Sequence, residues 1–402
     1  MIKRNLLVAL ISAGVAMLAM GCGDDTTDPA GFEWPANTAD AVATYAQIVQ
    51  KSYEDSYVAA VALNDSLKAF TADPTQEKLD AARQAWLDSR EPYLQTEVYR
   101  FYEGPIDNEA TGPEGSINAW PLDENFIDYT VDAPDGGIIN GTQTIDAATL
   151  DGLNGKNLDG TDGDDLDANV ATGYHAIEFL LWGQDLSDDG PGDRPFTDYV
   201  TDGTGTAANQ DRRATYLTVV GDLLAEQILA VHDEWVEGAA YRTSFVADEK
   251  DAFFKILQGM VVLSGFETGA ERLGAAYDSG SQEDEHSCFS DNTHRDMIQD
   301  IQGVLNVWNG TYGSINGTGV KDVVAAVDQA LADKVDARIK ESLALANALQ
   351  TPFDQAIKAG NDAGRQGVQD LMLSLKQQEK DMTEIFLLFG YGVEFIQANY
   401  EE

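Results

Sequence analysis

The sequence predicts an all-α protein built from two pseudo-symmetric helical bundles with long irregular loops. Most of the chain places apolar residues at helical spacing, and little of it alternates apolar and polar residues as a half-buried strand does. The two halves are also weakly alike, because each contains a helix that ends in Trp followed by Gly or Asn-Gly, in "FLLWG" (179–183) and "VLNVWNG" (304–310). We therefore predict one helical bundle over residues 38–205 and a second over 206–402.

The first residues predict export and a lipid anchor. "MIKRNLLVALISAGVAMLAMGC" has a basic start, an apolar stretch too short to span a bilayer, and then small residues before a cysteine. "LAMGC" resembles a bacterial lipobox. We expect a lipoprotein signal peptide over residues 1–21, lipidation of Cys22, and a flexible tether over 22–37. The mature protein would be attached to a bacterial membrane, with the outer membrane expected, and would face the periplasm or the cell surface.

The charge of the chain narrows the class of partner. There are 25 Lys and Arg against 69 Asp and Glu, which gives a net charge of −44. Nucleic acid is excluded as a partner because its phosphates would be repelled rather than neutralised. The acidic composition is typical of a solvated surface, and it also attracts cations. There are only two cysteines. With Cys22 lipidated, Cys288 would be alone and the fold would depend on its core.

The first half reads as helices around an irregular segment. Residues 38–70 have helical periodicity, "DPT" (73–75) interrupts it, and 76–102 resume it, with a kink or opening expected at Pro92. Residues 103–168 are dense in Gly, Pro, Asp and Asn. An irregular segment of this length is uncommon inside a compact domain and is usually functional or mobile. A short apolar helix at 173–183 follows it, and then a second loop over 183–210.

The second half is more regular. Helical periodicity predicts helices over residues 212–236, 250–277, 291–310, 320–349 and about 365–399.

Two polar side chains interrupt the apolar helix "GYHAIEFLLWG". His175 and Glu178 are three residues apart and therefore lie on one helix face. A helix that is apolar on every side is normally buried, and a buried carboxylate needs a partner. Either the two groups bond to neighbouring protein atoms, or they are ligands of a metal such as zinc or iron. The apolar surroundings also suggest that Glu178→Leu would fold and lose only binding.

Two more regions contain candidate site residues. "QEDEHSCFSDNTHRD" brings Glu285, His286 and His294 into one short loop, which either caps the following helix or contributes to a site. Polar stripes also run along two otherwise apolar helices. These stripes either face solvent or line a polar cleft between the bundles, and their charged members are Glu97 and Arg100 in the first half and Glu267 and Glu271 in the second.

Several blocks of the sequence resemble one family. "GYHAIE" fits the G-x-H-x-x-E motif of the imelysin family, exported bacterial proteins classed with metallopeptidases. "REPYLQTEVYRFYEGPID", "GPEGSINAWPLDENFIDYT" and "EDEHSCFSDNTHRD" are similar to its iron-regulated protein A subgroup. The resemblance covers about residues 38–400. It implies two pseudo-symmetric bundles with a shared site between them, a metal pair at His175 and Glu178, further cleft residues such as Asp123, and an association with iron uptake.

The residues favour binding over hydrolysis. A hydrolytic zinc site needs three protein ligands, a position for water and a general base. No H-E-x-x-H is present, so a third ligand would have to come from Glu97, Glu267, His286 or His294. We therefore expect a lipoprotein that binds iron or zinc, as an ion or a complex, at an interdomain cleft and works with other iron-uptake components. The alternative is a metallopeptidase that uses the His175/Glu178 site.

Overall fold

The computed structural model describes residues 32–164, 166–187, 189–394 and 396, and over these it is all-α as predicted. One two-stranded ribbon, β1 (Thr311–Tyr312) with β2 (Ile315–Asn316), accompanies the helices. The expected signal peptide, Cys22 and most of the expected tether lie outside the described residues.

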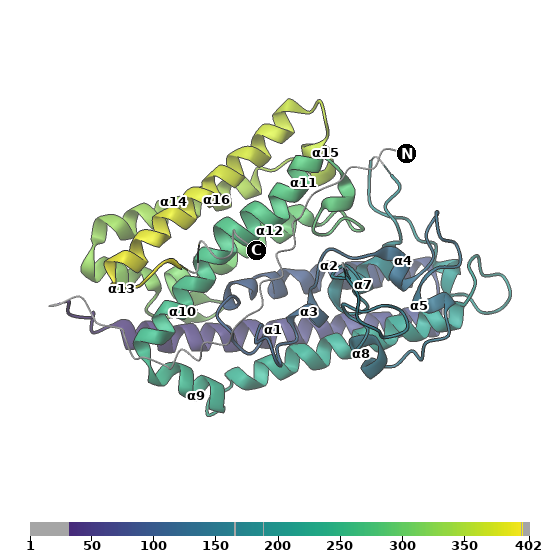
Figure 1. Cartoon of the computed structure of the whole chain (residues 1–402), viewed down its shortest axis with the longest axis horizontal. Coiled ribbons are helices and arrows are strands. Elements are labelled where there is room, and N and C mark those ends of the chain that lie inside the picture. Colours follow the sequence, from purple (N-terminus) through teal and green to yellow (C-terminus); the bar gives the residue numbers. More distant parts are fainter. Residues whose placement is uncertain (1–31, 165, 188, 395, 397–402) are drawn as a thin grey trace.

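The first group of helices is built on α1. Both α2 and α8 pack along α1, and α7 packs against α2 and α8 (Figure 1). By length and apolar composition α8 is the one described helix that could cross a membrane, but here it packs along α1. It begins just beyond the predicted division at residues 205/206, and that division stays a prediction. The bounds are α1 (Thr38–Ala72), α2 (Gln76–Leu94), α7 (Gly173–Trp182) and α8 (Gln210–Trp235).

The second group lies above α1 in Figure 1, on the side away from α8. Its helices α14 and α16 run diagonally above α12. The short helix α9 (Ala240–Ala247) leads into it. Its members are α10 (Glu249–Val262), η3 (Leu263–Arg272), α11 (Leu273–Ser279), α12 (Thr293–Asn309), α13 (Val320–Val327), α14 (Gln329–Asn347), α15 (Phe353–Ile357) and α16 (Asp362–Leu388).

Four predicted helices differ in detail from the observed ones. The C-terminal helix expected over about 365–399 ends at Leu388, and the chain turns at Gly390, which has a φ of 79°. The helix expected over 76–102 ends at Leu94, two residues after Pro92, where the chain turns into a short 3₁₀ helix, η1 (Glu97–Tyr99). The one expected over 320–349 is divided at Asp328, whose side chain accepts a hydrogen bond from the Leu331 amide and so starts α14. The one expected over 250–277 is continuous, but its middle, η3, is a π-helix.

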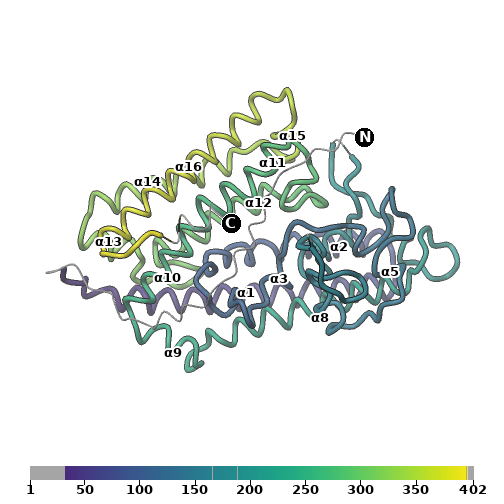
Figure 2. Tube along the Cα trace, in the orientation of Figure 1, coloured from purple at the N-terminus to yellow at the C-terminus, as the bar shows by residue number. Residues whose placement is uncertain are grey.

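The irregular segment between α2 and α7 runs along the first group, from residues 103–113 beside the C-terminal part of α8 to residues 137–140 beside its start (Figure 2). It contains four short helices, α3 (Glu114–Ile117), α4 (Glu124–Ile127), α5 (Gly137–Asn140) and α6 (Ala147–Asp151). Asp128 ties it to the core through the buried Arg194 and Arg213, with N–O distances of 2.7 Å to each. A buried ion network therefore adds to the apolar contacts that this segment makes with the core through residues such as Ile117 and Ile139.

Candidate functional site

The motif helix α7 begins at a position that only glycine suits. Gly173 has a φ of 85°, and a Cβ there would collide with the carbonyl group of Ile117. Thr172, just before it, donates a hydrogen bond to the Ser116 carbonyl at 2.9 Å. The first residue of G-x-H-x-x-E thus lets α7 pack directly on α3, and every residue of α7 is buried.

His175 and Glu178 contact each other inside this helix. The distance from His175 Nδ1 to Glu178 Oε2 is 2.9 Å, and both side chains are fully buried. The other carboxylate oxygen of Glu178 accepts hydrogen bonds from Ser290, at 2.9 Å from its amide and 2.6 Å from its hydroxyl. Burial raises the pKa of Glu178 to about 8, although Ser290 opposes the shift. Burial, aided by His286, lowers the pKa of His175 well below its usual value.

His286 completes a pair of imidazoles. Its ring centroid lies 4.9 Å from that of His175, and its Nδ1 lies 2.8 Å from Asp296 Oδ2. Burial lowers the pKa of His286 to about 4. Burial alone would raise the pKa of Asp296, but the buried Arg90 and His286 hold it at about 2. Both imidazoles are therefore neutral at pH 7, the form in which a histidine nitrogen can bind a metal.

Each imidazole leaves one nitrogen without a hydrogen bond. His175 Nε2 is buried and has no partner, and no hydrogen bond joins His286 Nε2 to any described residue. Asp296 is ionised and keeps the proton of His286 on Nδ1, which leaves its Nε2 open, the arrangement found around metal-binding histidines. Glu178 is mostly protonated at pH 7, so a cation that binds His175 would have to displace that proton. Among the described residues, however, no three His, Cys, Asp or Glu side chains are placed to share one ion.

A pocket of about 420 Å³ lies beside this pair. His286 and Trp120 line it. The buried ring of His175 does not line the pocket but packs against Trp120, with 5.0 Å between the two ring centroids. We call it the central pocket, and residues from both predicted halves line it: Arg100, Glu114, Asn118, Ala119, Trp120, Pro121, Glu267, Glu271, Arg272, Ala275, Asp284 and His286. Four carboxylates and two guanidinium groups are in this lining, so the pocket is acidic overall.

An ion network lies under the pocket. Arg272 on η3 contacts Glu97, Glu267 and Asp300, with N–O distances of 2.9 Å to Glu267 and 2.8 Å to Asp300. Arg100 also contacts Glu97, at 2.7 Å. The two arginines hold the pKa of Glu97 well below its usual value despite its burial. Burial and the nearby charge of Glu97 raise the pKa of Asp300 to about 7, although Arg272 opposes the shift.

This network makes the stability of the protein depend on pH. Between about pH 4 and pH 7 Asp300 holds a proton in the folded state that it loses on unfolding. Its contribution to the free energy of unfolding is therefore greatest below about pH 4 and is lost as the pH rises through 7. In Asp300→Asn the free energy of unfolding, measured in urea from pH 5 to pH 8, should fall less steeply with rising pH than in the wild type. The two slopes should differ by up to about 1.4 kcal/mol per pH unit. Parallel pH profiles for the two proteins would contradict this.

The central pocket brings together Arg100, Glu267, Glu271 and His286 from the predicted set, with Glu97 buried beneath it. The other predicted cleft residues do not line it. Asp123 caps α4 by accepting a hydrogen bond from the Asn125 amide at 3.0 Å.

Glu285 and His294 lie outside the lining as well. Burial raises the pKa of Glu285 well above its usual value, and the Thr293 hydroxyl opposes the shift. His294 lies in the first turn of α12, where burial lowers its pKa. The loop before α12 thus contributes His286 to the pocket wall and Ser290 to the hydrogen bonds with Glu178.

Sequence reasoning missed several residues of the site. Trp120, Ser290 and Arg272 give no local signal, because they come together only through the tertiary fold. Asp296 and Asp300 were missed too. They are four residues apart on α12 and both are buried, but polar neighbours such as Arg295 and Gln299 make this helix look partly exposed.

The fold and the site define an all-helical protein with a buried histidine–carboxylate motif beside an acidic pocket. The imelysin family model matches residues 49–382, and the chain belongs to the imelysin family. It is 25% identical over 320 residues to iron-regulated protein A of Synechococcus elongatus, which covers 76% of this chain and 72% of that protein.

Two crystal structures have a similar fold. The first is a candidate iron-regulated protein A precursor from Parabacteroides distasonis, with a TM-score of 0.68 and 17% identity over 89% of this chain and 97% of that one. The second is an imelysin-like protein from Psychrobacter arcticum, with a TM-score of 0.60 and 11% identity over 89% of this chain and 98% of that one. At 17% and 11% identity, these two similarities show that the fold is shared and carry no conclusion about function.

Proposed function

We propose that this protein binds iron, as an ion or as a complex, in the central pocket and serves iron acquisition outside the cytoplasm. The observation that carries the proposal is the imidazole pair, in which a carboxyl group contacts each Nδ1 and no hydrogen bond joins either Nε2 to a described residue. The similarity to an iron-regulated protein favours iron over zinc.

The set of donors suits a metal that brings ligands of its own. Two imidazoles fill only part of the coordination sphere of iron, and no third side chain among the described residues is placed to join them on one ion. Glu271 and Asp284 also line the pocket and add negative charge that attracts a cation. A partly chelated ion therefore fits the pocket better than a bare one.

The same contacts give less support to a peptidase. A hydrolytic metal site needs a third protein ligand and a base that can reach the bound water. Glu178, the carboxylate of the motif, is already engaged with His175 and Ser290. We therefore propose binding as the function.

We also propose that the protein is held at a bacterial membrane, which we expect to be the outer membrane, by lipid on Cys22. The pocket would then face the periplasm or the cell surface, where other iron-uptake components could deliver or receive the metal. Metabolic labelling with radioactive palmitate tests the anchor. The label should be incorporated into the wild-type protein and be absent from Cys22→Ser.

The binding site is tested by titrating the purified protein with Fe(II), ferric citrate and Zn(II) in a calorimeter. His175→Ala and His286→Ala should each weaken iron binding by at least 100-fold, because each removes one nitrogen donor of the pair. The matched control is His232→Ala on α8, since His232 is only partly buried and bonds to its neighbour Asp233.

Equal iron binding by the wild type and by both the His175→Ala and His286→Ala variants would refute the proposal. Peptide cleavage provides the comparison with the alternative function. Unfolded peptides should remain intact with and without a chelator, whereas chelator-sensitive cleavage that disappears in His175→Ala would favour a peptidase.

A further inference from the structure

The wall of the central pocket contains two hydrogen-bond donors without a partner. They are the side-chain nitrogens Asn118 Nδ2 and Arg100 Nε, and both atoms are buried. A buried donor that makes no hydrogen bond is costly, and native proteins rarely leave one unpaired. A ligand that accepts hydrogen bonds at these two atoms would recover that free energy. The two donors therefore bear on what the iron brings with it into the pocket.

The amide of Asn118 has a fixed orientation. Its Oδ1 accepts a hydrogen bond from Arg90 Nη1, and a guanidinium group can only donate. The nitrogen must therefore be the end of the amide that has no partner. Asn118 is only 3% exposed, so bulk water is not a ready substitute for that partner. An amide held in this way is a donor that is oriented before any ligand binds.

The same guanidinium group supports the imidazole side of the pocket. Arg90 Nη2 lies 3.5 Å from Asp296 Oδ2, and that oxygen lies 2.8 Å from His286 Nδ1. Arg90, Asp296, His286 and Asn118 are all buried. One buried ion pair thus positions two side chains of the pocket lining. Asn118 offers a hydrogen-bond donor there, and His286 offers a nitrogen that can bind a metal.

The negative charge of the lining is only partly neutralised. Glu114 lies 3.1 Å from Arg100, which also contacts the buried Glu97. No ion pair joins Glu271 or Asp284, which also line the pocket, to a described residue. A free carboxylate ion would therefore be repelled by the lining as a whole. A carboxylate that arrives on a metal ion brings the positive charge that compensates for this repulsion.

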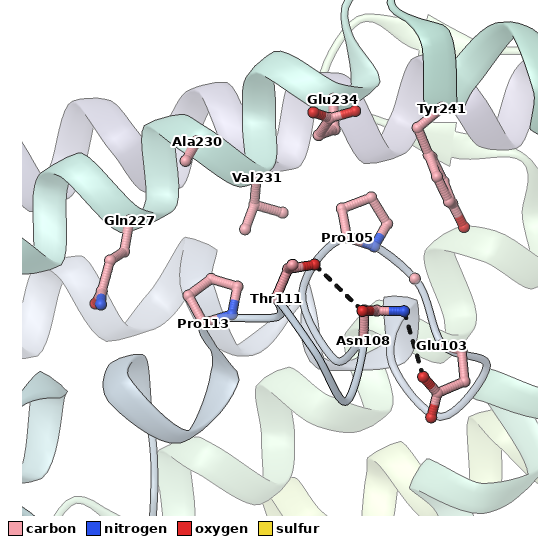
Figure 3. Close-up of a pocket in the computed structure, with 11 residues that line it drawn as sticks. Glu103, Pro105, Asn108, Thr111, Pro113, Gln227, Ala230, Val231, Glu234 and Tyr241 are labelled. Carbon is pink, nitrogen blue, oxygen red and sulfur yellow. Dashed lines mark hydrogen bonds between the residues drawn. The ribbon is translucent and has the colours of Figure 1, made fainter. Parts of the chain in front are cut away.

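The pocket between the loop over residues 103–113 and the helices α8 and α9 differs from the central pocket (Figure 3). It has a volume of about 470 Å³, but each polar side chain in its described lining is at least partly exposed. The side chains of Glu103, Asn108 and Thr111 bond to one another, as the dashed lines show. The buried donors of the central pocket thus have no counterpart in this lining.

We propose that the central pocket takes iron as a complex with a small di- or tricarboxylate. This inference rests on the proposed function, because His286 would bind the iron. A carboxylate oxygen of the chelator would accept hydrogen bonds from Asn118 Nδ2 and Arg100 Nε. Hydrogen bonds to a charged oxygen are about twice as strong as those to a neutral one, so these donors favour a carboxylate over a neutral chelator. The acidic lining would reject the same chelator when it carries no metal.

The first test is equilibrium dialysis of the purified protein against radioactive iron and radioactive citrate. With Fe(III) present, the protein should retain iron and citrate in equal amounts, and without iron it should retain far less citrate. Iron retained without citrate would overturn this inference and leave the proposed function intact. If the protein retained no iron in either form, both would be overturned.

The second test is the variant Asn118→Asp, which has almost the same shape. It keeps an oxygen for Arg90 and replaces the donor with a second oxygen. Binding of ferric citrate, measured by calorimetry, should weaken by about 10–100-fold, because the chelator loses a hydrogen bond and meets a like charge. Binding of Fe(II) without a chelator should become tighter, because the variant adds negative charge beside the cation. These opposite changes separate recognition of the chelator from recognition of the metal.

The matched control is Asn347→Asp, which makes the same change of charge at an exposed position on α14. It should alter neither titration. Ferric citrate that binds Asn118→Asp as tightly as the wild type, but is not bound by His286→Ala, would overturn this inference alone. A loss of the same size in Asn347→Asp would overturn it as well. Urea unfolding checks that Asn118→Asp is folded, and the dialysis of the wild type decides the question if it is not.

Discussion

Replacing Asp128 with alanine is expected to lower the free energy of unfolding by about 3–5 kcal/mol, because it leaves the buried guanidinium of Arg213 without its counter-ion and leaves Arg194 only its 3.4 Å contact with Asp198. Asp128 accepts hydrogen bonds from Arg194 at 2.7 Å and from Arg213 at 2.7 and 2.9 Å. All three side chains are buried. Urea unfolding followed by circular dichroism would measure the change.

The control for this variant is Asp73→Ala. Asp73 pairs with Lys78 at 2.7 Å, but its side chain is 73% exposed, so the change should cost no more than about 1 kcal/mol. If the two alanine variants were equally stable, the buried network would not be what holds the irregular segment to the core.

Glu178→Leu is expected to destabilise the folded protein by about 2–5 kcal/mol as well as to remove iron binding. The apolar surroundings of Glu178 alone suggested that leucine would be tolerated. The contacts change that expectation, because leucine would leave the amide and hydroxyl of Ser290 and His175 Nδ1 without partners in a buried place.

Glu178→Gln separates stability from binding. Glutamine keeps an oxygen for Ser290 and an amide that can face His175, so the fold should survive with a loss of about 1 kcal/mol. Iron binding should weaken by about 10–100-fold, because glutamine cannot lose a proton and supply a negative charge beside His175 when the cation binds. Urea unfolding and calorimetry on both variants would measure the two effects. A leucine variant as stable as the glutamine one would show that the bonds to Ser290 contribute little.

The regular parts of the fold were predictable from local patterns. Helical periodicity located α1, α8 and α12 closely, because each buries one apolar stripe along its whole length. The π-helix η3 was not predictable, because its sequence has ordinary helical periodicity. Close packing accompanies it, since a Cβ at Gly265 would collide with Glu379 on α16.

Only part of the site was predictable, because local patterns in the sequence do not show which distant residues meet in the fold. His175 and Glu178 stood out as polar groups in an apolar helix, and their burial is confirmed. The partner of each group could not be deduced, because Ser290 and His286 are more than a hundred residues away in the sequence. Spacing alone left two readings open, bonds to neighbouring protein atoms or a shared ion. In the structure Glu178 contacts the Nδ1 of His175, and the metal pair stays a prediction.

The arrangement of the two imidazoles has a consequence for the lifetime of the protein. His175 is carried by α7, whereas His286 is carried by the loop before α12, so a ligand held by both would bridge segments that are distant in the chain. Such a ligand binds only the folded state, and one present at 100 times its Kd adds about 2.7 kcal/mol to the free energy of unfolding. Loaded molecules would then outlast empty ones in the presence of proteases, and the amount of protein would follow the supply of the metal.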